Sequence, residues 1–164
     1  MMATHRTSTD GTARPAEESR GEIVVGVDGS DSSIAALRLA AELGDRLDVE
    51  VHALGVWNHP TLLYGNYYYP DSDITPEQDA HRVVEATLQA AFGESVPERV
   101  TAGTQQGRPA EVLIDRSMGA RMLALGTRGH GGFAGLLLGS VSAECTAHAH
   151  CPVLVVHETG DGRR

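Results

Sequence analysis

Short apolar runs alternate along this chain with segments of helical spacing, and this alternation constrains the fold more than any other feature. Residues 23–27 (IVVGV) are typical of a strand buried on both faces. Between the runs, apolar residues recur every three or four positions, as Ile34, Leu37 and Ala41 do. The pattern predicts an α/β fold, a single open parallel sheet with helices on both faces. The predicted strands are residues 23–27, 49–57, 96–104, 121–126 and 151–156, and the predicted helices are residues 33–46, 76–92, 110–117 and 138–148.

Composition indicates one domain with polar ends. Residues 1–20 are rich in Thr, Ser, Arg and Glu and have no apolar pattern, so they are predicted to form a disordered tail. The globular domain is predicted over residues 21–158, and residues 159–164 are expected to fray. The chain has 164 residues, of which 41% are hydrophobic, and this is enough to bury a core.

Charge and cysteine content narrow the class of protein. The formal net charge is −9, which argues against a nucleic acid partner held through its phosphates. All 13 basic residues are arginine, so no P-loop lysine exists, although genomic base composition alone explains the bias. The two cysteines form no disulfide framework, and no apolar run approaches the roughly 20 residues that span a bilayer. We therefore expect a cytoplasmic protein without membrane association.

Residues 126–142 (GTRGHGGFAGLLLGSVS) combine a strand end, a glycine-rich loop and a helix start. The segment holds six glycines and follows the apolar run 122–125. Glycine lets the backbone approach a ligand, and the N–H groups at a helix start attract anions. In parallel sheets, ligands bind beyond the carboxyl ends of the strands, where Asp28 and Gly126 are expected. The segment predicts a site for a phosphate-bearing ligand, with a nucleotide as the leading hypothesis.

The spacing of these glycines carries a family resemblance. Gly126, Gly129, Gly139 and Ser140 fit the pattern G-x2-G-x9-G-[ST], and VGVDGS (25–30), LGVW (54–57) and AHCPVLVV (149–156) extend the match. Over nearly all of residues 22–157 the chain resembles the universal stress protein family, in its ATP-binding branch. The resemblance implies a five-stranded Rossmann-like sheet, similar to the adenine nucleotide alpha hydrolases, of order 3-2-1-4-5. It also implies ATP at the rim of strands one and four and a homodimer joined through strand five, at Val153, Leu154, Val155 and Val156.

The resemblance also assigns nucleotide-binding positions. Gly26 and Asp28 would lie near the adenosine, and Val56 would line the adenine pocket. The loop would wrap the ribose and phosphates, while the helix start would offer N–H and hydroxyl groups to the phosphates. Ser140 or Ser142 would touch a nucleotide-bound Mg²⁺. The loop residues are Gly126, Thr127, Arg128, Gly129, His130, Gly131 and Gly132, and those of the helix start are Gly139, Ser140, Val141 and Ser142.

Several residues have a second interpretation. Asp28 could cap the first helix, but Ser30 or Asp31 can do so equally well, which favours Asp28 as a ligand contact. Arg128 and His130 either reach phosphate or are solvated on the loop. The tyrosine-rich stretch 58–75 could stack on a base, form an interaction surface or be partly disordered.

Cysteine and histidine side chains near the end of the last helix suggest metal spacing at first sight. Because two of them lie where the helix gives way to a strand, convergence on one ion is not expected, and a helix C-terminus that favours imidazolium explains the pattern better. These residues are Cys145, His148, His150 and Cys151.

The leading functional hypothesis is an ATP-binding stress or regulatory protein that acts through nucleotide-dependent conformation or partner binding. The alternative is a slow ATPase or an adenylyl-transferring enzyme of the same superfold. The pyrophosphate loop SGGxDS of ATP pyrophosphatases is absent, since residues 28–33 read DGSDSS, and no catalytic residue is predicted. Strand five, apolar and expected at a sheet edge, independently favours a dimer because pairing would cover that edge.

Overall fold

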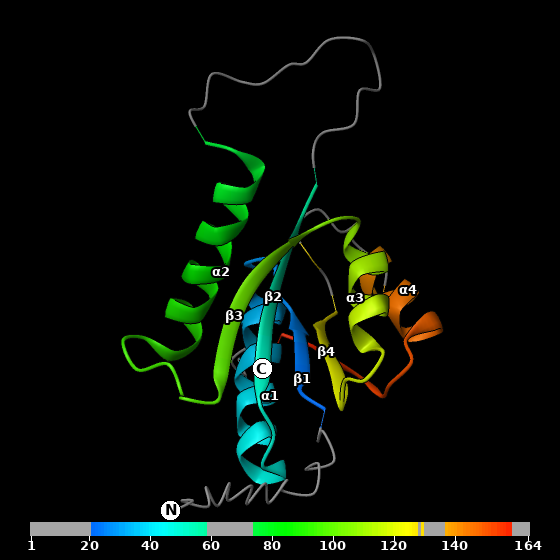
Figure 1. Ribbon diagram of the computed structural model, residues 1–164, viewed down its shortest axis with the longest axis horizontal. Helices are drawn as coiled ribbons and strands as arrows, with labels where there is room; N and C mark the ends of the chain where they lie inside the picture. Colours follow the sequence, from blue (N-terminus) through cyan, green and yellow to red (C-terminus); the bar gives the residue numbers. More distant parts are fainter. Residues whose placement is uncertain (1–20, 59–73, 128, 130–136, 159–164) are drawn as a thin grey trace, which may run out of the picture.

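The computed structural model describes residues 21–58, 74–127, 129 and 137–158, and within these ranges strands and helices alternate along the chain (Figure 1). The elements are β1 (Ile23–Gly26), α1 (Asp31–Leu47), β2 (Val51–Trp57), α2 (Pro76–Phe92), β3 (Val100–Gln106), α3 (Pro109–Ser117), β4 (Met122–Gly126), α4 (Ser140–His148) and β5 (Val153–Val156).

The five strands form one parallel sheet in the order β3-β2-β1-β4-β5. β1 lies at its centre, with Ile23 opposite Val51 of β2 and Met122 of β4. The predicted α/β fold and the strand order implied by the family resemblance are therefore confirmed. Because the chain turns from one side of β1 to the other between β3 and β4, the carboxyl ends of β1 and β4 form the topological switch point where ligands bind in such sheets.

The central strand divides the core into two layers. Ile23 and Val25 pack with Leu37 on the face covered by α1 and α2, while Val24 packs with Leu113 on the face covered by α3 and α4 (Figure 1). All five side chains are almost completely buried. This alternation is the pleat of a strand with both faces covered, as the continuous apolar run predicts. None of the described helices is both long and apolar enough to span a membrane.

Hydrogen bonds of side chains fix where two helices begin near the carboxyl ends of the strands. The Ser30 hydroxyl accepts the Ser33 N–H at 3.3 Å at the start of α1. At α2, the Gln78 N–H donates to Thr75 Oγ1 at 3.2 Å and the Thr75 N–H donates to Gln78 Oε1 at 2.9 Å. This is a capping box, followed by Pro76 at the first helical position as the sequence predicts.

Strand three was predicted from residue 96, but β3 begins at Val100. The Pro97 carbonyl accepts the Val100 N–H at 2.9 Å, so a turn precedes the strand, and Val96 remains 41% exposed. The strand then continues to Gln106, because it pairs with β2 as far as Trp57. The turn at Pro97 sets the start of this strand, and pairing with β2 sets its end. Neither contact can be recognised from the residue pattern of one segment.

Candidate functional site

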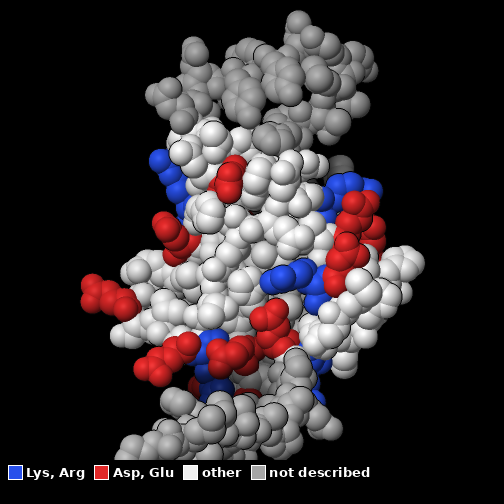
Figure 2. Space-filling model, viewed as in Figure 1, with Lys and Arg blue, Asp and Glu red and all other residues white. Residues whose placement is uncertain are grey.

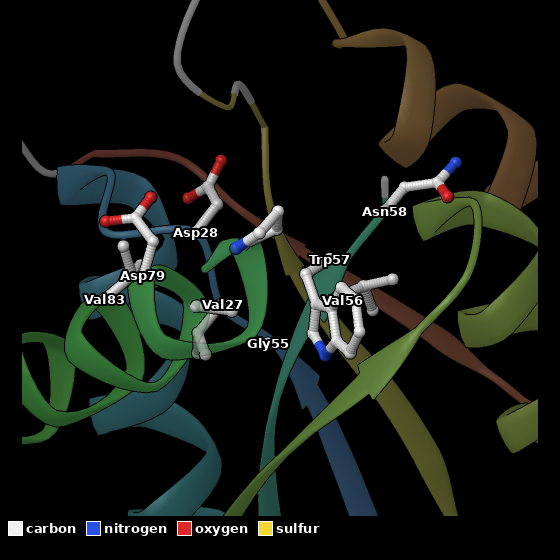
Figure 3. Close-up of a pocket in the computed structure, with 10 residues that line it drawn as sticks. Val27, Asp28, Gly55, Val56, Trp57, Asn58, Asp79 and Val83 are labelled. Atoms are coloured by element: carbon white, nitrogen blue, oxygen red, sulfur yellow. The ribbon is translucent and has the colours of Figure 1, made fainter. Parts of the chain in front are cut away.

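A pocket of about 310 Å³ opens between the carboxyl ends of β1 and β2 and the first turns of α2 (Figure 3). A concave, mainly apolar wall with a few polar groups is the usual form of a small-molecule site. In Figure 3 the carboxylates of Asp28 and Asp79 lie on one side, and the Trp57 indole lies on the other. The lining residues are Val27, Asp28, Gly55, Val56, Trp57, Asn58, Pro76, Asp79, Ala80 and Val83.

Asp28 is held in a fixed position just beyond the end of β1, after Val27. Its Oδ1 accepts the Ser30 N–H at 3.0 Å and the Ser30 hydroxyl at 2.6 Å. Because the same hydroxyl accepts the Ser33 N–H, Ser30 rather than Asp28 caps α1. Asp28 therefore does not cap α1, and it is among the residues that line the pocket.

The glycine-rich segment meets β1 at Gly129. A Cβ on Gly129 would collide with Oδ2 of Asp28, so any side chain at this position would force the Asp28 carboxylate to move. The structure thereby brings together two of the predicted site residues, Asp28 and Gly129. Val56, a third, lines the pocket on the β2 side.

Gly26 and Gly126 contribute to packing beneath the site. A Cβ on Gly26 would lie 2.7 Å from Cδ2 of Leu125, and one on Gly126 would lie 2.8 Å from the backbone nitrogen of Ser33. Both glycines allow neighbouring elements to approach β1 and β4. Direct contact of these two residues with a nucleotide remains a prediction.

Main-chain hydrogen bonds close the glycine-rich segment at its base. The Thr127 N–H donates to the Val156 carbonyl at 2.9 Å, and the Thr127 carbonyl accepts the Gly139 N–H at 2.7 Å. The buried Ser142 hydroxyl donates to the Gly126 carbonyl at 2.7 Å. Two groups expected to face phosphate, the Gly139 N–H and the Ser142 hydroxyl, thus donate within the protein in this structure. Their partners are distant in sequence, so the motif gave no sign of them.

The start of α4 differs electrostatically from the starts of the other described helices. It has no side-chain cap and no acidic residue in its first turn. By contrast, α1 has Asp31, α2 has Glu77 and Asp79, and α3 has Glu111 in the first turn. The partial positive charge of the first N–H groups is therefore uncompensated at α4, and an anion is favoured there.

Some predicted residues lie outside the described part of the chain, among them Arg128, His130, Gly131 and Gly132, and so does most of the tyrosine-rich stretch, residues 59–73. The pocket also contains residues that were not predicted from the sequence, and one of them is Asp79, which reaches it from α2. It also missed Trp57, although the segment LGVW that contains it was part of the family resemblance.

The suspected metal residues do not converge where they are described. Cys145 is fully buried, whereas His148 and His150 are exposed. Burial, with the nearby Glu144 charge, raises the pKa of the Cys145 thiol to about 11. The described ranges contain no group of three His, Cys, Asp or Glu side chains placed to hold a metal ion. Cys145 belongs to the core between the sheet and α3.

Charges on the face shown in Figure 2 are mixed. Acidic and basic side chains are interspersed around a largely uncharged centre, and the described arginines on this face do not gather into one broad patch.

Comparison with known proteins identifies the family. The model of the universal stress protein family matches residues 20–157. Universal stress protein Rv2623 of Mycobacterium tuberculosis is 33% identical over 138 residues, which are 84% of this chain and 45% of that protein. A universal stress protein of Mycolicibacterium smegmatis is 31% identical over 147 residues, 89% of this chain and 49% of that protein. The chain belongs to the universal stress protein family, and it spans about half the length of these curated relatives.

Solved structures share the fold. A universal stress protein in complex with cAMP has a TM-score of 0.59 at 23% identity, covering 85% of this chain and 98% of that chain. The universal stress protein of Archaeoglobus fulgidus in complex with dAMP has a TM-score of 0.56 at 21% identity, with 83% and 97% covered. UspA of Lactobacillus plantarum has a TM-score of 0.59 at 22% identity, with 84% and 97% covered.

Proposed function

We propose that this domain binds an adenine nucleotide, ATP with Mg²⁺, and acts as a stress-response regulator through nucleotide-dependent conformation or partner binding. The observation that carries the proposal is the contact between Asp28 and Gly129, which joins the pocket to the glycine-rich segment. Two relatives of the same fold, the complexes with cAMP and dAMP, hold adenine nucleotides and so support this ligand class.

The two helix starts at the rim favour one orientation of the nucleotide. The start of α2 beside the pocket is capped and carries Glu77 and Asp79, so it disfavours an anion. The start of α4 is uncapped and free of acidic residues. The uncharged nucleoside therefore enters the pocket, and the phosphates lie toward Ser140 at the start of α4.

The site supports binding better than turnover. Oδ1 of Asp28 already accepts two hydrogen bonds from Ser30, which suits a fixed acceptor for a ligand group. Since the nucleotide is held and not rapidly consumed, its presence can act as a signal. This is the reason for favouring a regulatory role over a metabolic one.

β5 supports a homodimer. It lies at the edge of the sheet, and its residues Val153, Leu154, Val155 and Val156 are each only half-buried. An edge strand has unpaired backbone groups along its outer side, and pairing with the same strand of a second copy would satisfy them. We propose that the domain dimerises through this edge.

Calorimetric titration with ATP and Mg²⁺ tests the proposed ligand. Gly129→Asp places a carboxylate beside Asp28, and Ser140→Asp places one at the α4 start, where the helix itself tolerates negative charge. Each is expected to weaken ATP binding by roughly 10-fold or more, about 1.4 kcal/mol. Ala147→Asp, which adds the same charge at the exposed far end of α4, serves as the control and should bind like the wild type.

Trp57 provides a second readout, because it is the one tryptophan of the chain and lines the pocket. ATP should change its fluorescence with the same affinity that calorimetry gives. The proposal fails if the wild type binds ATP no more tightly than Gly129→Asp does. Mass spectrometry of any nucleotide released from the denatured protein identifies the physiological ligand.

A further inference from the structure

We propose that Asp79 determines which nucleotide the pocket accepts, by accepting a hydrogen bond from the uncharged nucleoside end of the ligand. The donor is an exocyclic amino group of the base or a ribose hydroxyl. This inference rests on the proposed function, since it concerns the same pocket.

Packing holds Asp79 at the pocket wall. Its N–H donates to the Thr75 carbonyl at 2.9 Å, within the capped first turn of α2. Farther along the helix, Val84 and Thr87 are buried against the sheet. A Cβ on Gly55 would lie 2.5 Å from Cγ2 of Val84, so the helix lies unusually close to β2. Asp79 is thus presented from a rigid helix and not from a loop.

The chemistry of the pocket explains why a second carboxylate matters. Asp28 and Asp79 both line it, on the same side in Figure 3. Ionised carboxylates only accept hydrogen bonds, so the two together select ligand groups that donate and repel groups that carry negative charge. Amino and hydroxyl groups of a nucleoside meet this requirement, and a phosphate does not.

Glu77 supplies a matched comparison. It carries the same charge in the same first turn of α2 but is not among the residues that line the pocket. Glu77→Gln therefore removes one negative charge from the helix start without removing a lining group. Comparing the two variants therefore distinguishes a direct contact made by Asp79 from the effect of negative charge at the start of α2.

The test is calorimetric titration of wild type, Asp79→Asn and Glu77→Gln with three ligands: ATP, ITP, which lacks the amino group, and 2′-deoxy-ATP, which lacks one ribose hydroxyl. The wild type should prefer ATP over one of the two analogues by roughly 10-fold or more, because the bound nucleoside would cover the exposed Asp79 carboxylate, and an acceptor covered without a partner is costly. Weaker binding of ITP than of ATP assigns the contact to the base, and weaker binding of 2′-deoxy-ATP than of ATP assigns it to the ribose. Asp79→Asn should lose most of this preference, because a neutral amide oxygen accepts a weaker hydrogen bond than a carboxylate does and the amide adds a donor. Glu77→Gln should keep the preference.

The outcomes separate the two proposals. If the wild type binds ATP and Asp79→Asn keeps its affinity and preference, the role of Asp79 is wrong and nucleotide binding stands. Equal affinity of the wild type for all three ligands, or equal effects of Asp79→Asn and Glu77→Gln, also overturns it. If the wild type binds no adenine nucleotide, the proposed function itself fails. Matching thermal unfolding of the three proteins shows that each is folded.

Discussion

Oδ2 of Asp28 lies so close to Gly129 that a Cβ on this glycine would collide with it. This contact joins the end of β1 to the glycine-rich segment, two parts of the chain that are far apart in sequence. It connects a carboxylate that lines the pocket to the segment expected to hold phosphate. The effect of a side chain at Gly129 therefore depends on what must move to make room for it.

Gly129→Ala should weaken ATP binding by roughly 10-fold while leaving stability almost unchanged. The atom in the way is the end of the Asp28 side chain, which can rotate aside at little cost to the fold. Rotation would break the hydrogen bonds from Ser30 that orient the carboxylate. Calorimetry and thermal unfolding measure the two effects, and undiminished affinity would contradict the importance of the contact.

Unlike Gly129→Ala, Gly126→Ala should destabilise the fold. Its Cβ would lie 2.8 Å from the backbone nitrogen of Ser33, and backbone at the start of α1 cannot move aside. Overpacking of this kind costs about 1–3 kcal/mol, which urea unfolding measures. The control is Gly103→Ala in β3, where the nearest atoms, in the His52 ring, lie 3.5 Å from the new Cβ. Similar losses in both variants would contradict this explanation.

Local patterns predicted the fold well because each element carries its own signals. The apolar run of β1, and Thr75 and Pro76 at the start of α2, need no knowledge of the rest of the chain. Features made by tertiary contact were not predictable in this way. The Pro97 turn moved the start of β3, and α2 brings Asp79 to the pocket because it packs closely on β2.

The same limit applies at the start of α4. The motif marked Gly139 and Ser142 as groups that face phosphate, but it could not show that their donors are already used by Thr127 and Gly126. Residue type and spacing indicate where a donor lies along the chain. Which acceptor it meets depends on the assembled sheet.

The two cysteines should differ sharply in reactivity. Cys145 is fully buried, and burial raises the pKa of its thiol to about 11, so almost no thiolate is present at neutral pH. Cys151 is only half-buried, although burial raises its pKa as well. Iodoacetamide should label Cys151 in the folded protein and Cys145 only after unfolding, as peptide mass spectrometry can show. Labelling of Cys145 in the folded Cys151→Ser variant would contradict this.

His52 should make the fold less stable in mild acid. It is half-buried in β2, and desolvation, with a smaller effect of Arg116, lowers its pKa below the ordinary 6.5 despite the opposing Glu22 charge. The unfolded chain therefore binds the proton more readily, and stability falls as pH drops below about 6.5. Urea unfolding across this range should show a shallower loss for His52→Gln than for wild type. If His52→Gln leaves the pH dependence of the free energy of unfolding unchanged, His52 is not its cause. His148→Gln, at an exposed position, is the control.

The hydrogen bond from the Gly139 N–H to the Thr127 carbonyl fastens both ends of the glycine-rich segment with main-chain atoms alone. Bringing the two ends of such a segment together is its main entropic cost, and in the folded domain this hydrogen bond already holds them together. Because main-chain atoms make this anchor, it does not depend on the side chains that the two anchor positions carry. The domain is thus suited to divergence, since descendants of one ancestor could acquire different ligand preferences while inheriting the same sheet.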